Sequence, residues 1–220
     1  MRRVIVLRPE PGASETVARA RQLGLDAVAM PLFEIEPLDW AAPNSAAFDG
    51  LLLTSANAVR QAGGQLHLLR QLPVYAVGEA TAAAARQAGL NVAETGASGV
   101  EALLGSLSPT LNLLHLCGED RTVPAAARPV LTAVPVYRAS RCAPPDLGAA
   151  RGAVVLVHSP RAGRGLAELV ADRGSIAIVA ISPATAASVG DGWDRIAIAD
   201  QPSDQALLAL AARLCNNTGA

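Results

Sequence analysis

Lysine is absent from the sequence: all 18 basic residues are arginines. A chain without lysine cannot form a Schiff base with a substrate and has no lysine for a phosphate-binding loop. The motifs H-E-x-x-H, G-x-S-x-G, G-x-x-x-x-G-K and G-x-G-x-x-G are missing as well. The sequence therefore gives no support for zinc hydrolysis, serine-esterase chemistry, nucleotide phosphates or a dinucleotide cofactor.

Histidines and cysteines are few and scattered. His67, His115 and His158 are widely separated, and the last two lie in or at the end of apolar runs, as expected of core or strand-end histidines. The three cysteines form no C-x-x-C pair, which is typical of free thiols in a reducing cytosol. We therefore expect no metal and no cofactor.

The charge is small and no apolar run is long. Charged residues make up 17% of the chain, and the net charge of -1 gives no global attraction to nucleic acid or to acidic membranes. Apolar runs such as 153–157 fall far below the roughly 18 residues of a membrane span, and the apolar stretch before Arg8 is too short for a signal peptide. We expect a cytoplasmic protein that binds neither nucleic acid nor membrane.

Hydrophobic residues, at 51%, are sufficient for one large core or two small ones. Short apolar runs alternate with alanine-rich helical stretches, the pattern of an α/β fold with parallel sheets flanked by helices. The pattern predicts strands at 4–7, 27–38, 50–53, 74–77, 111–116, 131–136, 153–157 and 176–181. It predicts helices at 13–23, 57–63, 81–88, 100–107, 161–172, 184–189 and 204–214.

The order of these segments repeats. Thr54-Ser55 corresponds to His158-Ser159, and Thr81 to Thr185, with each pair 104 positions apart (185 − 81). At the front of the two copies the offset is 109 (115 − 6), so the second copy is about five residues shorter in its first helix, after Glu119. The repeat predicts two similar α/β halves.

Two of the predicted strands are unusually long. Residues 27–38 and 131–142 are each about twice the usual strand length of 5 to 6 residues, so both segments could cross between domains. In that arrangement residues 1–35 and 139–220 form a discontinuous first domain, and residues 39–134 form an inserted second domain. The linker strands would then lie at about 34–38 and 135–140.

Polar turns follow the predicted strands, at the end of a parallel sheet where ligands bind. Their hydroxyls and free amides suit carboxylates or phosphates, although Ser and Thr are also ordinary helix caps. Arg8 could clamp a carboxylate or could be a solvated or interdomain arginine. Tyr137 could donate a hydrogen bond into an interdomain cleft or pack at a hinge. The turns are 8–14, 54–57, 78–81, 117–122, 158–161 and 182–185.

Several of these segments together resemble one known family. The segments are R-P-E-P near the start, P-L-F-E-I-E-P, F-D-G-L-L-L-T-S-A-N-A-V, V-Y-A-V-G-E-A-T-A, L-L-H-L-C-G-E, V-P-V-Y-R and the later S-P and P-A-T-A turns. In this order, over nearly the whole chain, they resemble the uroporphyrinogen-III synthase family. The resemblance implies two α/β domains joined by a two-stranded β-ladder.

The resemblance also implies an activity. Members of the family are lyases of haem biosynthesis that close hydroxymethylbilane, an open tetrapyrrole with eight carboxylates, into uroporphyrinogen III with loss of water and inversion of the last ring. Because free bilane closes by itself to the uninverted isomer, such an enzyme works mainly by orienting its substrate. The resemblance further implies a monomer without cofactor or metal, and leaves open a transient contact with the upstream deaminase.

Carried over position by position, the resemblance makes Tyr137 the residue that protonates or hydrogen-bonds the leaving hydroxyl. Two positions depart from the family pattern: Ser182 replaces a glycine, and His158 replaces a threonine or small residue. The residues expected to bind substrate are Arg8, Thr54, Ser55, Gly78, Thr81, Ser159 and Thr185.

Two other readings compete with this one. A non-catalytic two-domain protein that senses an anionic small molecule needs the same amides but no acid, so the orientation of the Tyr137 hydroxyl distinguishes it. A sugar or nucleotide transferase would need a glycine-rich phosphate loop or metal-chelating acids, which the sequence lacks.

Overall fold

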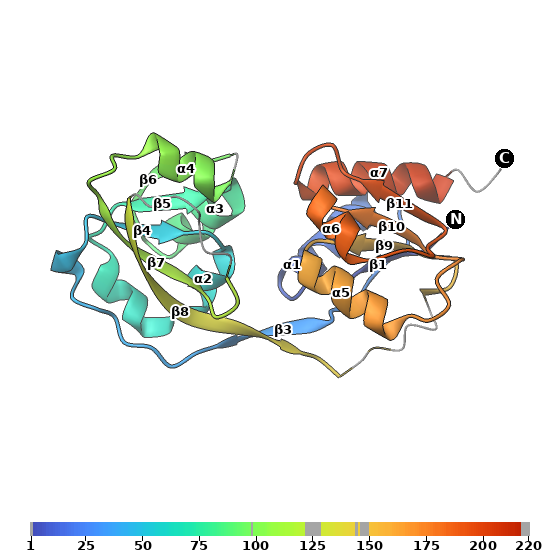
Figure 1. Ribbon diagram of the computed structural model, residues 1–220, viewed down its shortest axis with the longest axis horizontal. Helices are drawn as coiled ribbons and strands as arrows, with labels where there is room; N and C mark the ends of the chain where they lie inside the picture. Colours follow the sequence, from blue (N-terminus) through green and yellow to red (C-terminus); the bar gives the residue numbers. More distant parts are fainter. Residues whose placement is uncertain (1, 98, 122–128, 144, 146–149, 217–220) are drawn as a thin grey trace. The chain divides into compact units, whose positions relative to one another are not determined.

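The computed structural model describes residues 2–97, 99–121, 129–143, 145 and 150–216. The chain divides into two compact units: unit 1 comprises Met1–Glu34 and Ser140–Ala220, and unit 2 comprises Ile35–Ala139. Each unit has a sheet flanked by helices (Figure 1), so the predicted α/β fold class is confirmed. The predicted shortening of the helix after Glu119 falls on 122–128, outside the described residues.

Unit 1 contains a five-stranded sheet in the order β11-β10-β9-β1-β2, and all neighbouring strands in it are parallel. Its strands are β1 (Val4–Val6), β2 (Ala27–Ala29), β9 (Val154–Val157), β10 (Ala177–Ala180) and β11 (Arg195–Ile198). Its helices are α1 (Gly12–Gln22), α5 (Pro160–Leu169), α6 (Pro183–Ser188) and α7 (Asp204–Asn216). Both faces of the central strands are buried, which explains why these strands are continuous apolar runs rather than alternating ones.

Alternate residues of the unit 1 strands belong to different layers of the core. Val4, Val6, Val154 and Leu156 pack with the buried sides of α1 and α7 in one cluster. Helix α5 contacts β9 and α6 contacts β10 and α5, so these two helices cover the opposite face (Figure 1). Helices α5 and α6 approach closely at Gly163, where an added Cβ would collide with the Ser188 hydroxyl oxygen.

Unit 2 is built on a six-stranded sheet in the order β3-β8-β7-β4-β5-β6. The strands are β3 (Phe33–Pro37), β4 (Gly50–Leu53), β5 (Val74–Val77), β6 (Val92–Gly96), β7 (Asn112–Gly118) and β8 (Val130–Arg141). The helices are α2 (Ala56–Gln61), α3 (Glu79–Gln87) and α4 (Val100–Ser106), with short 3-10 segments at Ser45–Ala47 and Gly63–Leu69. Strands β4 to β8 are parallel to one another, so their carboxyl ends lie at one edge.

The core of unit 2 also has two layers. On one face, Leu51, Leu53 and Val74 pack against the buried sides of α2 and α3. On the other face, Leu52 and Leu113 pack against α4. The seven predicted helices all overlap observed helices, because an alanine-rich amphipathic pattern between buried strands specifies a helix strongly.

The predicted single strand at 27–38 is wrong: it is two strands, β2 and β3, separated by residues 30–32. Strand β2 pairs with β1 in the unit 1 sheet, whereas β3 pairs with β8 in the other sheet. Pro31 lies at the break, where the absence of an N–H donor makes continued sheet pairing unfavourable. The other long segment is one 12-residue strand, β8.

Strands β3 and β8 form an antiparallel ladder. The Leu38 amide donates to the Val136 carbonyl at 3.0 Å, and the Arg138 guanidinium pairs with Glu36 at 2.8 Å. Residue numbers on the two strands therefore rise in opposite directions. The chain changes unit within this ladder, at 34/35 and at 139/140.

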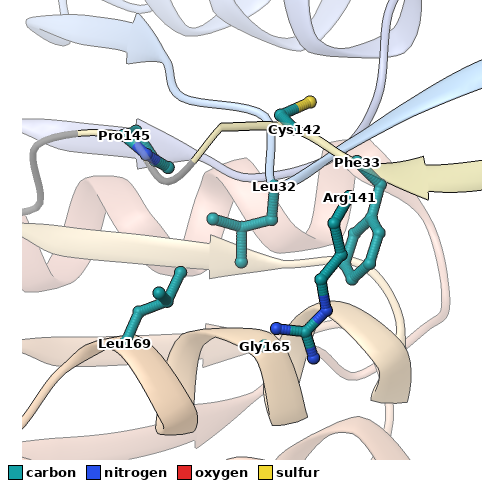
Figure 2. Close-up of a pocket in the computed structure, with 7 residues that line it drawn as sticks. All are labelled: Leu32, Phe33, Arg141, Cys142, Pro145, Gly165 and Leu169. Carbon is teal, nitrogen blue, oxygen red and sulfur yellow. The ribbon is translucent and has the colours of Figure 1, made fainter.

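The residues at the unit 1 end of the ladder pack against α5. An added Cβ at Gly165 would lie 3.4 Å from Leu32 and 3.5 Å from Phe33, and Arg161 stacks over the Phe33 ring at 4.6 Å. A small cavity of about 80 Å³ remains at this contact (Figure 2). Burial raises the pKa of the Cys142 thiol beside it, which favours the unreactive thiol form. The cavity is lined by Leu32, Phe33, Arg141, Cys142, Pro145, Gly165 and Leu169.

Two strands, β6 and β11, were not predicted from the sequence. Each is the edge strand of its sheet and has mostly half-buried or exposed residues. Edge strands lack the continuous apolar run that marks a central strand, so the hydrophobic pattern did not reveal them. Among the described helices, none combines the length and apolar character of a membrane span.

Candidate active site

Polar residues gather at the carboxyl-end edge of each sheet, where the turns lead into the flanking helices. In unit 2, these turns follow β4, β5 and β7, and in unit 1 they follow β1, β9 and β10. Amide groups at helix N-termini and hydroxyl side chains together favour anionic ligands. Every predicted site residue lies in one of these turns or nearby, with Tyr137 on the neighbouring strand β8.

Ser55 and Thr54 follow β4 directly. The Ser55 hydroxyl oxygen accepts a hydrogen bond from the Asn57 amide at 3.2 Å and so caps α2. This is the ordinary helix-capping role, and it also fixes the orientation of the side chain.

Thr54 pairs with a histidine from the neighbouring strand. Its hydroxyl oxygen lies 3.0 Å from Nε2 of His115, a residue of β7 that is buried. Burial lowers the pKa of His115 from 6.5 to about 4, and the nearby Arg121 contributes to this lowering, so the imidazole is neutral at pH 7. A neutral ring can fix the direction of the Thr54 hydroxyl without adding a charge. Sequence reasoning treated His115 as a core residue and missed this contact.

Gly78 ends the turn after β5 and precedes α3. Its φ of +81° lies in the region that side chains other than glycine rarely adopt. The Thr81 amide donates to the Gly78 carbonyl at 3.1 Å, and the Thr81 side chain is buried in the first turn of α3. The glycine therefore permits the tight entry into the helix that places Thr81.

Tyr137 lies against the end of β7. A Cβ added at Gly118 would lie 2.9 Å from Cζ of Tyr137 and 3.1 Å from its hydroxyl oxygen. The Glu119 amide donates to the Tyr137 carbonyl at 2.9 Å, which fixes the backbone at the same point. The half-buried ring also packs against the α2–α3 side of the core. Gly118 thus makes the space in which the phenol lies at the edge of the sheet.

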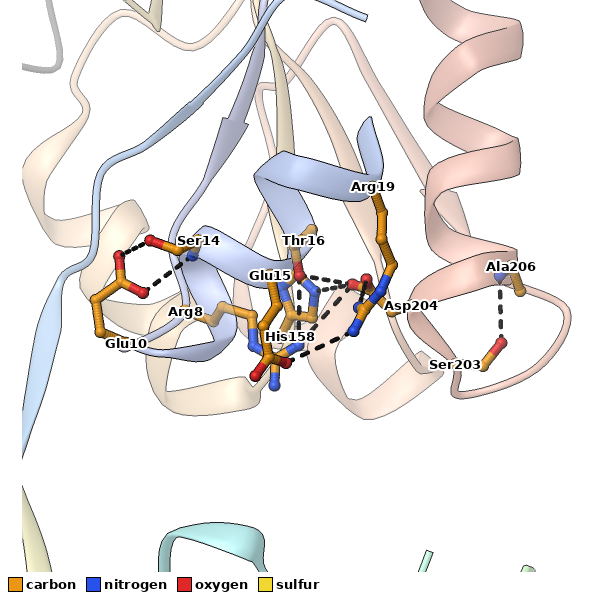
Figure 3. Close-up of polar contacts among 10 residues, drawn as sticks. All are labelled: Arg8, Glu10, Ser14, Glu15, Thr16, Arg19, His158, Ser203, Asp204 and Ala206. Atoms are coloured by element: carbon orange, nitrogen blue, oxygen red, sulfur yellow. Dashed lines mark hydrogen bonds and ion pairs between the residues drawn. The ribbon is translucent and has the colours of Figure 1, made fainter. Parts of the chain in front are cut away.

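Arg8 follows β1 in unit 1 and turns back onto α1. A Cβ at Gly12 would lie 2.5 Å from Nε of Arg8, so the guanidinium occupies the space beside this glycine. Its Nη1 donates to the Thr16 hydroxyl at 3.4 Å and lies 3.9 Å from the Asp204 carboxylate (Figure 3). The Arg8 side chain keeps 34% of its surface exposed, which leaves it accessible to a ligand.

His158 takes the position in unit 1 that Thr54 takes in unit 2. Its Nε2 lies 3.1 Å from Oδ1 of Asp204, and Arg19 pairs with the other carboxylate oxygen at 2.5 Å (Figure 3). Burial lowers the pKa of His158 despite this partner. Burial would raise the pKa of Asp204, but hydrogen bonds from His158, Thr16 and Arg19 outweigh it and lower the pKa to about 2.

Three further hydroxyl residues of unit 1, Ser159, Ser182 and Thr185, lie at the starts of its helices. Ser159 accepts from the Ala162 amide at 3.2 Å and caps α5, while Ser182 accepts from the Thr185 amide at 3.3 Å and caps α6. The Thr185 hydroxyl lies 3.0 Å from that of Ser182. Thr185 has no exposed surface, so the half-buried Ser182 is the member of this pair nearer to solvent.

The structure thus brings Thr54, Gly78 and Tyr137 to one edge of unit 2, and Arg8 and Ser159 to one edge of unit 1. Asp204 was missed as a site neighbour, because it is 46 positions from His158 and no motif links them. Among the described residues, no group of three histidine, cysteine or acidic side chains is placed to hold a metal ion.

Two units with parallel sheets flanked by helices, together with the strand ladder, place the chain in the class of two-domain α/β proteins. The sequence matches the family profile described as Uroporphyrinogen-III synthase HemD over residues 14–209, so the chain belongs to the uroporphyrinogen-III synthase family. This family consists of lyases of haem biosynthesis, as the sequence segments predicted.

Solved structures share the fold. The uroporphyrinogen-III synthetase of Helicobacter pylori is 18% identical, with a TM-score of 0.66 over 97% of this chain and 100% of that one. A mutant uroporphyrinogen III synthase of Thermus thermophilus is 19% identical, with a TM-score of 0.55 over 99% and 100%. Comparison with curated protein sequences gives no significant match.

Proposed function

We propose that this chain converts hydroxymethylbilane into uroporphyrinogen III, with Tyr137 as the proton donor to the departing hydroxyl. Loss of water leaves a reactive intermediate whose terminal carbon attacks the last pyrrole ring through a spiro intermediate. In the first step the carbon–oxygen bond breaks, and the oxygen takes a proton to leave as water. The terminal carbon then bonds to the substituted α-carbon of the last ring, which gives the spiro intermediate. The bond from that α-carbon to its bridging carbon breaks, the bridging carbon bonds to the free α-carbon of the same ring, and the proton on this carbon is lost.

The placement of Tyr137 carries this proposal. Its phenol lies in the space beside Gly118, at the same carboxyl-end edge of the unit 2 sheet as the turns that carry Thr54 and Gly78. A positioned acid typically contributes about 10² to 10⁴-fold to a rate. A purely binding protein would not need a proton donor at this point.

Groups that can bind carboxylates support this proposal in each unit by itself. In unit 2 these are the Thr54 hydroxyl and the amides at the starts of α2 and α3, and in unit 1 they are Arg8 and the amides at the start of α5. Holding a flexible chain in the geometry of the spiro intermediate is worth roughly 7 to 11 kcal/mol in favourable cases.

A coupled assay tests the proposal. Porphobilinogen and its deaminase generate hydroxymethylbilane, which closes to isomer I unaided; the products are then oxidised and isomers I and III are separated. With this chain present, isomer III should dominate. A product that stays isomer I while the chain binds uroporphyrin III would instead identify a non-catalytic binding protein.

The proposed setting is a cytoplasmic monomer that takes its substrate from the deaminase. Free thiols at Cys117, Cys142 and Cys215 support a reducing compartment. Light scattering measures the oligomeric state, and the yield of isomer III with deaminase and this chain mixed or kept apart by a membrane tests whether a transient contact contributes.

A further inference from the structure

A chain of polar contacts connects Arg8 to the start of α7. Arg8 Nη1 donates to the Thr16 hydroxyl oxygen at 3.4 Å, and the Thr16 hydroxyl donates to Oδ1 of Asp204 at 2.9 Å (Figure 3). Arg8 follows β1, Thr16 belongs to α1, and Asp204 is the first residue of α7. Two neighbouring segments at the start of the chain therefore meet the start of α7, 188 positions from Thr16, in one hydrogen-bonded path.

The chemistry of the acceptor fixes the direction of these bonds. An ionised carboxylate can only accept, so the Thr16 hydroxyl must direct its single proton to Asp204. The Thr16 oxygen then presents lone pairs to the Arg8 guanidinium, which can only donate. Thr16 has no exposed surface, so water does not compete for its hydroxyl.

The ionisable groups of this path each have a single protonation state at neutral pH. The lowered pKa of Asp204 keeps its carboxylate ionised at neutral pH, and the lowered pKa of His158 keeps that imidazole neutral. Because Asp204 only accepts, its contact with His158 assigns the proton of the neutral ring to Nε2. The guanidinium also lies against Gly12, where an added Cβ would be 2.5 Å from its Nε.

We infer that Thr16 and Asp204 are positioning residues that hold the Arg8 guanidinium in place for a substrate carboxylate. This inference rests on the proposed function, in which Arg8 binds the anionic substrate. A long arginine side chain loses several rotamers when it binds, and a side chain that is already held loses fewer. Thr16 and Asp204 thus raise the affinity of Arg8 for a carboxylate without contacting the ligand themselves.

The test measures binding of uroporphyrin III, an octacarboxylate probe, by fluorescence titration at fixed ionic strength. Thr16→Val removes the hydroxyl at nearly constant volume and should raise Kd about three- to tenfold. Thr16→Ser keeps the hydroxyl and should restore Kd to within about twofold of the parent. Asp204→Asn should weaken binding in the same direction, and it provides a second variant if Thr16→Val fails to fold.

The decisive measurement is a double-mutant comparison. Arg8→Ala should raise Kd, and adding Thr16→Val to Arg8→Ala should change it no further, because the hydroxyl acts only through the guanidinium. A merely structural threonine would lower the melting temperature of both backgrounds and would not show this coupling in Kd.

Two control variants distinguish the effect of Thr16 and Asp204 on Kd from the effect of any change of charge in unit 1. Asp172→Asn removes the same charge from an exposed pair of unit 1, in which Asp172 lies 2.9 Å from Arg151. Arg151→Ala removes the positive charge of the same exposed pair and changes no partner of Asp204. Both variants should bind the probe like the parent.

The inference is overturned if folded Thr16→Val and Asp204→Asn bind like the parent, if Thr16→Val weakens the Arg8→Ala variant equally, or if the parent does not bind the probe. Failure of the proposed function is a different result: the parent would leave isomer I as the product of the coupled assay. A parent that makes no isomer III can still show the Arg8–Thr16 coupling in probe binding.

Discussion

The ring of Tyr137 occupies the space that a side chain at Gly118 would need. A Cβ at position 118 would lie 2.9 Å from Cζ and 3.0 Å from Cε2 of the ring, closer than ordinary van der Waals contact. The two residues are partners in the pairing of the parallel strands β7 and β8, directly after a register shift between Cys117 and Gly118. The site therefore depends on a glycine that is itself chemically inert.

Gly118→Ala should displace the Tyr137 phenol and leave the fold intact. The added methyl group forces the ring to move, whereas the backbone hydrogen bond of the Glu119 amide to Tyr137 can persist. We expect isomer III formation to fall about tenfold or more, as for loss of the acid itself. Gly105→Ala, at a helical position with open space around it, serves as the control. Parental activity in Gly118→Ala would contradict the assigned position of the phenol.

Tyr137→Phe keeps the ring and removes its proton. A single positioned acid typically contributes about 10² to 10⁴-fold. Because the dehydrated bilane also forms unaided, we expect a smaller fall in isomer III, of about tenfold or more, with a matching rise in isomer I. The melting temperature should not change. If Tyr137→Phe forms isomer III at the parental rate while Thr81→Ala does not, the tyrosine only packs against the strand.

Arg8 should make substrate binding sensitive to salt. Its guanidinium is about one-third exposed and lies beside Thr16 and Asp204, so a bound carboxylate would form a partly solvated ion pair. Such pairs are screened over about 8 to 10 Å at moderate ionic strength. Comparison of Kd for uroporphyrin III across a salt series should give a shallower slope for Arg8→Ala than for the parent. Equal affinity and an equal salt slope in both proteins would show that Arg8 does not bind the substrate.

The central strands and the helices could be predicted because their signals are local. A run such as residues 153–157 is apolar on both faces, and an alanine-rich segment follows it. The break between β2 and β3 was not predicted, because residues 27–38 remain mostly apolar through Pro31 and only the pairing partners change. Sheet membership is a tertiary property that a hydrophobic pattern does not encode.

The candidate site also has residues that could be predicted from the sequence and partners that could not. Arg8, Thr54 and Tyr137 follow or occupy predicted strands, so their positions at a sheet edge follow from the order of elements. The partners that fix them, His115 for Thr54 and Asp204 for the Arg8 path, come from segments far away in sequence. Prediction of those contacts requires the strand order and the helix packing, which no local signal supplies.

His115 should make the stability of the protein depend on pH in the mildly acidic range. Its pKa is about 4 when folded, because burial and the nearby Arg121 disfavour the charged ring, and about 6.5 when unfolded. As the pH falls below 6.5, the unfolded chain takes up a proton that the folded chain does not. The free energy of unfolding should therefore be highest above pH 6.5 and fall as the pH approaches 4, by about 3 kcal/mol in total for this group.

Urea denaturation followed by circular dichroism between pH 4.5 and 7.5 measures this dependence. His115→Gln, which can still hydrogen-bond to Thr54 but does not titrate, should flatten the slope. The slope that remains should come from His158, whose pKa is lowered in the same direction. Asp204 contributes little in this window. Its lowered pKa stabilises the fold fully above about pH 3.8, and this stabilisation is lost only as the pH falls from 3.8 to about 2. An unchanged slope in His115→Gln would mean that the folded protein binds the proton at this histidine as readily as the unfolded chain does.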